Sequence, residues 1–163
     1  QQKSNERFAE DFLEGSAEER LETRLDQAVD RYETLYGRLN DGQRAQVLAG
    51  LRQSPFDARR SQAERLRRQA DLVQTVRQIQ ALPRNDGGNG SAPAAAVEAV
   101  RGWFQRSLQS PDPAYASLSQ QMLQHGCEQF AALHNSTTPA QRAHALQLIQ
   151  DYGADFRALA APR

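Results

Sequence analysis

The three histidines and the single cysteine are the residues best suited to bind a metal. His125 and Cys127 are two residues apart, which places them on different faces of a helix. His134 and His144 lie on either side of an expected turn, without carboxylates at ligand spacing. Structural metal sites usually need four converging ligands. We therefore expect no metal and no cofactor, and interpret the histidines as surface or helix-end residues.

A cysteine becomes a nucleophile when a nearby base and a positive environment stabilise its thiolate. Cys127 falls in the middle of an expected helix, one turn before Phe130. This position predicts a small buried apolar side chain rather than a reactive thiol. As the only cysteine of the chain, it forms no internal disulfide.

Other polar patterns also have plain structural explanations. The carboxylate pairs Asp11/Glu14 and Asp151/Asp155 have the spacing of a solvated helix face. The glycine-rich segment 87–90 lacks the lysine and the strand-to-helix context of a phosphate-binding loop, so it is typical of a linker. The sequence therefore predicts no catalytic residue and no enzyme.

Two features are candidates for partner binding. The first is a set of four arginines expected on the outer face of one helix: Arg59, Arg60, Arg67 and Arg68. They could bind phosphates or an acidic protein. The second is Trp103, since an exposed tryptophan often anchors an interface. Trp103 stands next to Phe104, so one of these two aromatic rings must face away from the helix seam, and a second buried face is the alternative.

The arginines could instead pair within the chain. Residues 1–33 hold 10 acids and 5 bases, whereas residues 44–84 hold 9 bases and 3 acids. We favour this interpretation, in which the acidic helix near 16–33 lies close to the basic helix near 57–80. The whole chain has no net charge, so no global field attracts nucleic acid or a membrane.

The elements that position these residues include one helical hairpin that occurs twice. The first copy contains Tyr32, Leu35, Tyr36 and Gly37, and then Asn40 with Gln43. The second contains Phe130, Leu133, His134 and Asn135, and then Thr138 with Gln141. Each copy has a helix end followed by a capping box that opens the next helix. A further capping box at Ser16–Glu19 opens the helix before the first copy.

The remaining sequence also predicts helices, with no segment of alternating β-branched residues. Pro55 suits the first turn of a helix that ends near Leu82. Its expected inward residues are Phe56, Leu66, Ala70, Val73, Val76 and Ile79. The last helix is expected to turn Ala145, Ile149, Tyr152, Phe156 and Leu159 inward.

The predicted fold is all-α, with about six or seven antiparallel helices and two similar helix-turn-helix hairpins. We expect one helical domain over residues 1–163, with a flexible loop at 83–93 between two halves that each contain a hairpin. No apolar run approaches the length that spans a membrane.

Three blocks of sequence resemble a family of uncharacterised proteobacterial lipoproteins, over the C-terminal region of its members. The blocks are Arg7–Arg20, Tyr36–Leu39 with Gln43–Ala45, and His134–Arg142 with Tyr152–Leu159. The resemblance implies a periplasmic protein that a lipid anchor outside these residues holds on a bacterial envelope membrane. A second likeness is to periplasmic chaperones of the Spy type, whose Leu-Thr-x-x-Gln signature is similar to residues 39–43 and 137–141.

From these observations we expect the soluble part of an envelope lipoprotein that binds or scaffolds other envelope proteins without catalysis. The alternatives are a chaperone-like helical protein of the periplasm and a hydrolase with a site between the helical halves. We expect no nucleic-acid partner.

Overall fold

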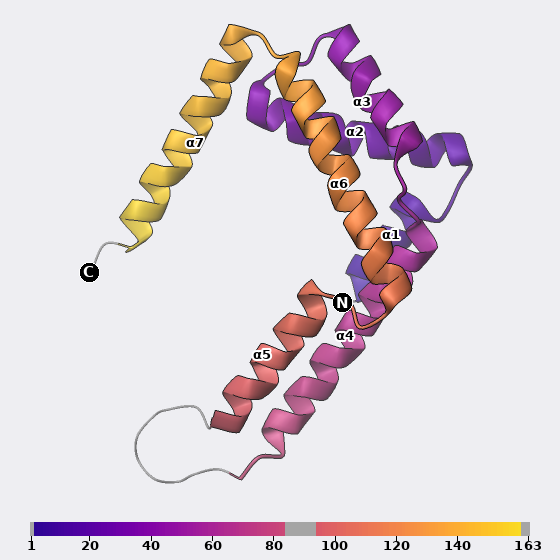
Figure 1. Cartoon of the computed structure of the whole chain (residues 1–163), viewed down its shortest axis with the longest axis vertical. Helices are drawn as coiled ribbons and strands as arrows, with labels where there is room; N and C mark the ends of the chain where they lie inside the picture. The colour runs from indigo at the N-terminus through magenta and orange to yellow at the C-terminus, as the bar shows by residue number, and fades with distance from the viewer. Residues whose placement is uncertain (1, 84–93, 161–163) are drawn as a thin grey trace. The chain divides into compact units, whose positions relative to one another are not determined.

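The computed structural model describes residues 2–83 and 94–160, and every regular element in these ranges is an α-helix (Figure 1). The helices are α1 (Gln2–Phe12), α2 (Ala17–Tyr36), α3 (Asp41–Gln53), α4 (Ala58–Gln80), α5 (Ala94–Leu108), α6 (Pro113–Asn135) and α7 (Pro139–Ala160). The all-α fold is therefore confirmed. The expected loop at 83–93 lies outside the described residues, except for Pro83.

The helix starts follow the predicted capping chemistry. Ser16 caps α2 in a full capping box with Glu19, and Asn40 caps α3 in a second one with Gln43. Gly37 ends α2 with a positive φ of 73°, a conformation in which a side chain would be strained. The expectation for Pro55 was wrong. Helix α4 begins at Ala58, because the side chain of Asp57 accepts a hydrogen bond from the Arg60 amide and so fixes the cap there.

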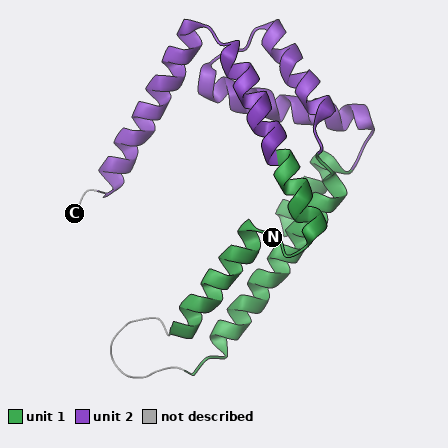
Figure 2. Cartoon of the chain, in the orientation of Figure 1, with its two compact units in different colours: residues 1–13, 56–122 green, residues 14–55, 123–163 purple. Residues whose placement is uncertain are grey.

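The chain divides into two compact units, each built from two separate stretches (Figure 2). Unit 1 comprises residues 1–13 and 56–122, in which α4 packs against α1 and α5. Unit 2 comprises residues 14–55 and 123–163, in which α2 packs against α3 and α7. Both copies of the repeated hairpin contribute to unit 2, and the acidic helix α2 and the basic helix α4 belong to different units. Their predicted pairing stays a prediction.

Unit 2 holds a small apolar core between its two hairpins, α2–α3 and α6–α7. Ala28, Leu39, Val47 and Leu133 are buried together, and Leu133 is the most enclosed of them with 1% of its surface exposed. Burial of a leucine of this kind contributes about 2 kcal/mol. The core therefore joins the C-terminal end of α6 to the first hairpin.

The two capping glutamines of the hairpins bind each other inside unit 2. Gln43 Nε2 donates to Gln141 Oε1 over 2.9 Å, and Gln141 Nε2 donates to Gln43 Oε1 over 3.0 Å. Each amide also donates to a backbone carbonyl of the opposite hairpin, Ser136 for Gln43 and Arg38 for Gln141. We call this arrangement the glutamine pair.

The glutamine pair joins equivalent residues, since Gln43 and Gln141 are 98 residues apart. The same offset relates Tyr36 to His134. The Tyr36 hydroxyl and His134 Nδ1 share a hydrogen bond of 2.8 Å. Contacts of a residue with its own equivalent are typical of an interface between two like copies. These contacts between equivalent residues of the two hairpins fit the internal repeat predicted from the sequence.

Substitution of Gly50 by alanine is expected to weaken unit 2, because the added methyl group would displace the side chain of Gln129, which lies against Gly50. A Cβ at Gly50 would lie only 3.0 Å from Gln129 Cγ and closer still to the end of that side chain. The Gly50 carbonyl also accepts a hydrogen bond of 2.9 Å from His125. We expect a loss of about 1–2 kcal/mol in the free energy of unfolding, measured with denaturant.

The matched control is Gly126→Ala on α6, where the added methyl group meets open space. It should gain up to about 1 kcal/mol from helix propensity. Equal gains for both variants would show that the approach at Gly50 does not limit stability.

Candidate partner-binding surface

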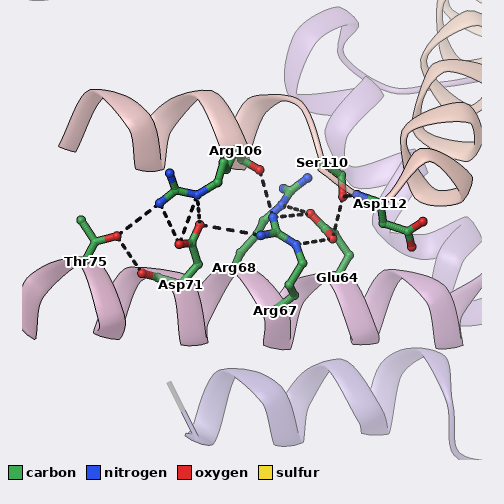
Figure 3. A network of polar contacts seen from close by, with 8 residues as sticks. All are labelled: Glu64, Arg67, Arg68, Asp71, Thr75, Arg106, Ser110 and Asp112. Atoms are coloured by element: carbon green, nitrogen blue, oxygen red, sulfur yellow. Dashed lines mark hydrogen bonds and ion pairs between the residues drawn. The ribbon is translucent and has the colours of Figure 1, made fainter. Parts of the chain in front are cut away.

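Two of the arginines predicted to face solvent on α4, Arg67 and Arg68, form ion pairs within unit 1. Glu64 is 4% exposed, and its side chain extends from α4 toward Ser110 in the segment between α5 and α6 (Figure 3). Arg67 donates two hydrogen bonds to its carboxylate, at 2.8 and 2.9 Å, and Arg68 donates one at 2.8 Å. Ser110 Oγ donates a further one at 3.0 Å. Burial raises the pKa of Glu64, but these hydrogen bonds lower it more, to about 2.

A second carboxylate extends this network along the helix. Asp71 accepts hydrogen bonds from Arg106 of α5 at 2.8 and 3.0 Å, and these hold its pKa below the usual value. Arg67 also donates to the backbone carbonyl of Arg106 at 2.9 Å (Figure 3). Glu64 and Asp71 are two helical turns apart, so the network fixes α5 along one side of α4.

The predicted orientation of α4 was therefore wrong. Glu64 and Thr75 are its buried residues, whereas Leu66, Ala70, Val73 and Val76 are exposed. Leu66, Ala70 and Val73 line a shallow open groove together with Gln69, Gln74 and Arg77. Apolar spacing cannot reveal that a carboxylate and two arginines from one helix turn toward α5 and α6.

The four arginines do not form one solvated face. Arg59 and Arg60 are exposed, and Arg60 pairs with Asp57 at 3.4 Å. Arg68 lies half a turn away from Arg59 around the helix and places its guanidinium 5.9 Å from the ring centre of Tyr115. The internal partners of Arg60, Arg67 and Arg68 lie in α4, at its cap and in neighbouring segments of unit 1, which leaves little of a shared anion site.

Trp103 is only half-buried, and its ring packs edge-on against Phe104 with 4.8 Å between centroids. Its indole nitrogen is buried and has no hydrogen-bond partner within the described residues. Of the two neighbouring aromatics, Phe104 is the one that the structure exposes. Trp103 as a partner anchor stays a prediction.

The three histidines each have a structural contact. His134 bonds to Tyr36, His125 to the Gly50 carbonyl, and His144 Nδ1 to the Leu35 carbonyl over 3.1 Å. Across residues 2–83 and 94–160, no three His, Cys, Asp or Glu side chains gather in a way that could hold a metal.

The burial predicted for Cys127 was wrong, because this residue is exposed. The less exposed residues of α6 recur at 118, 122, 125, 129 and 133, and position 127 falls on the opposite side of the helix from that row. None of the helices in the described ranges has the length and apolarity to cross a membrane.

The strongest unassigned feature is the C-terminal part of α7. This helix has 22 residues, whereas its equivalent α3 has 13 and ends at Gln53, the counterpart of Asp151. The additional turns carry Tyr152, Phe156 and Leu159, and Phe156 and Leu159 are 71% and 82% exposed. Ile149 on the same row is also exposed. We call Ile149, Tyr152, Phe156 and Leu159 the α7 row.

The exposure of the α7 row contradicts the sequence prediction, because the spacing of these four residues predicts that they face inward. Only Ala145, at the beginning of the row, is buried. Spacing alone does not distinguish an apolar row that packs against other helices of unit 2 from one that extends beyond those helices into solvent. The signal available in the sequence was the length of the apolar pattern after Gln141, which exceeds that after Gln43.

Comparison of the chain with known protein families, curated proteins and solved structures gives no match. Several exposed apolar residues also lie on α5, namely Val97, Val100, Phe104 and Leu108. The α7 row differs from them because three of its members, Tyr152, Phe156 and Leu159, lie in turns that have no counterpart in α3.

Proposed function

We propose that this chain is a non-catalytic module that binds another protein through the α7 row. The observation that carries the proposal is the exposure of four large apolar side chains on one face of α7, three of which lie beyond the part equivalent to α3. Exposed apolar patches of soluble proteins often mark sites of interaction. Aromatic residues such as Tyr152 and Phe156 are well suited to anchor a partner.

The place of action that we propose is the bacterial envelope. This part of the proposal depends on the resemblance of residues 7–20, 36–45 and 134–159 to the lipoprotein family, which implies a periplasmic module on a lipid anchor. The partner would then be another envelope protein, which would bind the exposed α7 row away from the core of unit 2.

A photo-crosslinking amino acid at Phe156 tests this function in intact cells. We expect a discrete crosslinked product, because the side chain would be buried against the partner. The matched control is the same amino acid at Gln150, which is exposed on the other side of α7. Products that are the same at both positions, or that persist when Leu159 is replaced by glutamate, would contradict binding through the row.

A further inference from the structure

We propose that the partner of the α7 row is an amphipathic helix with basic residues along one flank. This inference rests on the proposed function and names the kind of partner that the same site accepts. Ile149, Tyr152, Phe156 and Leu159 recur at intervals of three and four residues, the spacing by which one helix packs lengthwise on another. An apolar helix laid along such a row is a common form of peptide recognition.

The row continues an interface that already joins two helices. Helix α7 packs on α2 near its beginning, where His144 bonds to Leu35 and Ala145 is buried. Ala145 and Ile149 are one turn apart on the same face, so the surface that meets a helix within unit 2 extends without a break into the exposed row. A second helix can therefore lie on the later turns of α7.

The charged residues beside the α7 row indicate the charge that the flank of the partner helix carries. Asp151 and Asp155 are four residues apart and lie on one flank of the row, whereas Arg157 lies on the other side. Neither aspartate has a basic residue three or four positions away on α7, so the helix itself does not neutralise this flank. Asp151 accepts a hydrogen bond of 2.8 Å from Gln147, a neutral side chain. A flank of lysine or arginine on the partner would complement both acids.

The test uses the full chain and two synthetic helical peptides about as long as α7. Both peptides carry leucine at alternating intervals of three and four, and their flanks are lysine in one and glutamate in the other. Isothermal titration calorimetry should show that the lysine peptide binds about tenfold more tightly than the glutamate peptide. Asp151→Lys/Asp155→Lys should weaken the lysine peptide about fivefold and strengthen the glutamate peptide.

Two further variants define what counts as failure. Phe156→Glu/Leu159→Glu should weaken both peptides at least about tenfold, while Gln150→Glu should not, and circular dichroism checks that each variant keeps its helix content. Equal binding of the two peptides would overturn the basic flank. Sedimentation that shows a dimer of the chain, lost in Phe156→Glu/Leu159→Glu, would overturn it in favour of a second copy. If neither peptide binds while Phe156 still crosslinks a specific product, the inference fails and the proposed function stands.

Discussion

Replacement of Gln43 by leucine is expected to lower the free energy of unfolding by about 3 kcal/mol. Gln43 is 2% exposed, and its amide donates to Gln141 and to the Ser136 carbonyl while accepting from the Asn40 amide. Leucine fills a similar volume but leaves the buried Gln141 amide without its partner, and each such unpaired group costs about 1–3 kcal/mol. Denaturant unfolding followed by circular dichroism measures the loss.

A double-mutant cycle separates the pairing from the capping. Gln141→Leu alone should cost about as much as Gln43→Leu, because the two residues are equivalent and both are buried. The double variant should cost less than the sum of the two, since no glutamine side chain is then left without its partner. Gln150→Leu, on the exposed side of α7, serves as the control and should change stability by less than about 0.5 kcal/mol. Strict additivity in the cycle would contradict the reciprocal contact.

Replacement of Glu64 by glutamine is expected to cost about 2 kcal/mol at neutral pH. The carboxylate is nearly enclosed and accepts from Arg67, Arg68 and Ser110, with a pKa of about 2. Glutamine keeps the size of the side chain but removes the charge that compensates the two guanidinium groups. The free energy of unfolding at pH 7 measures the difference.

The contribution of the Glu64 carboxylate to stability depends on pH. Because the pKa of Glu64 in the folded chain is lower than its ordinary value of 4.5, the carboxylate stabilises the fold at pH values above that value. Its contribution is lost as the pH falls from about 4.5 toward 2. The difference between the wild-type chain and Glu64→Gln should therefore shrink over this range.

Glu98→Gln is the matched control for this prediction, because Glu98 pairs with Arg101 at the surface of α5. Exposed pairs contribute little, about 0–1 kcal/mol. A difference between wild type and Glu64→Gln that stays constant down to pH 2.5 would show that the buried ion pairs do not stabilise unit 1.

Local sequence predicted the helices and most of their starts, with the start of α4 as an exception. Ser16 with Glu19 and Asn40 with Gln43 form the capping boxes that their spacing indicated, because capping depends on residues a few positions apart. The repeat was also visible from the sequence. That the two capping glutamines would bind each other was not, since it depends on contacts between segments 98 residues apart.

The orientation of helices was the weakest part of the prediction. On α4, the spacing predicts that the apolar positions face inward, but the buried side of the helix holds Glu64 and Asp71, which bind Arg67 and Arg106. On α7, the apolar row passes beyond the helices that cover its first turns. Both errors have the same origin. An apolar row in the sequence shows which face of a helix is apolar, but it does not show whether another part of the protein covers that face.

The division of unit 2 between two distant stretches affects how the chain can fold during synthesis. The first hairpin is complete at Gln53, but its partner begins only at Leu123. At a usual rate of ~5–20 residues per second, the ribosome needs roughly 3–15 seconds to reach that point. During this interval Leu39, Val47 and Gln43 lack the C-terminal hairpin that buries them in the finished structure. A nascent chain paused between Gln53 and Leu123 would expose this surface of the first hairpin to chaperones and to other nascent chains.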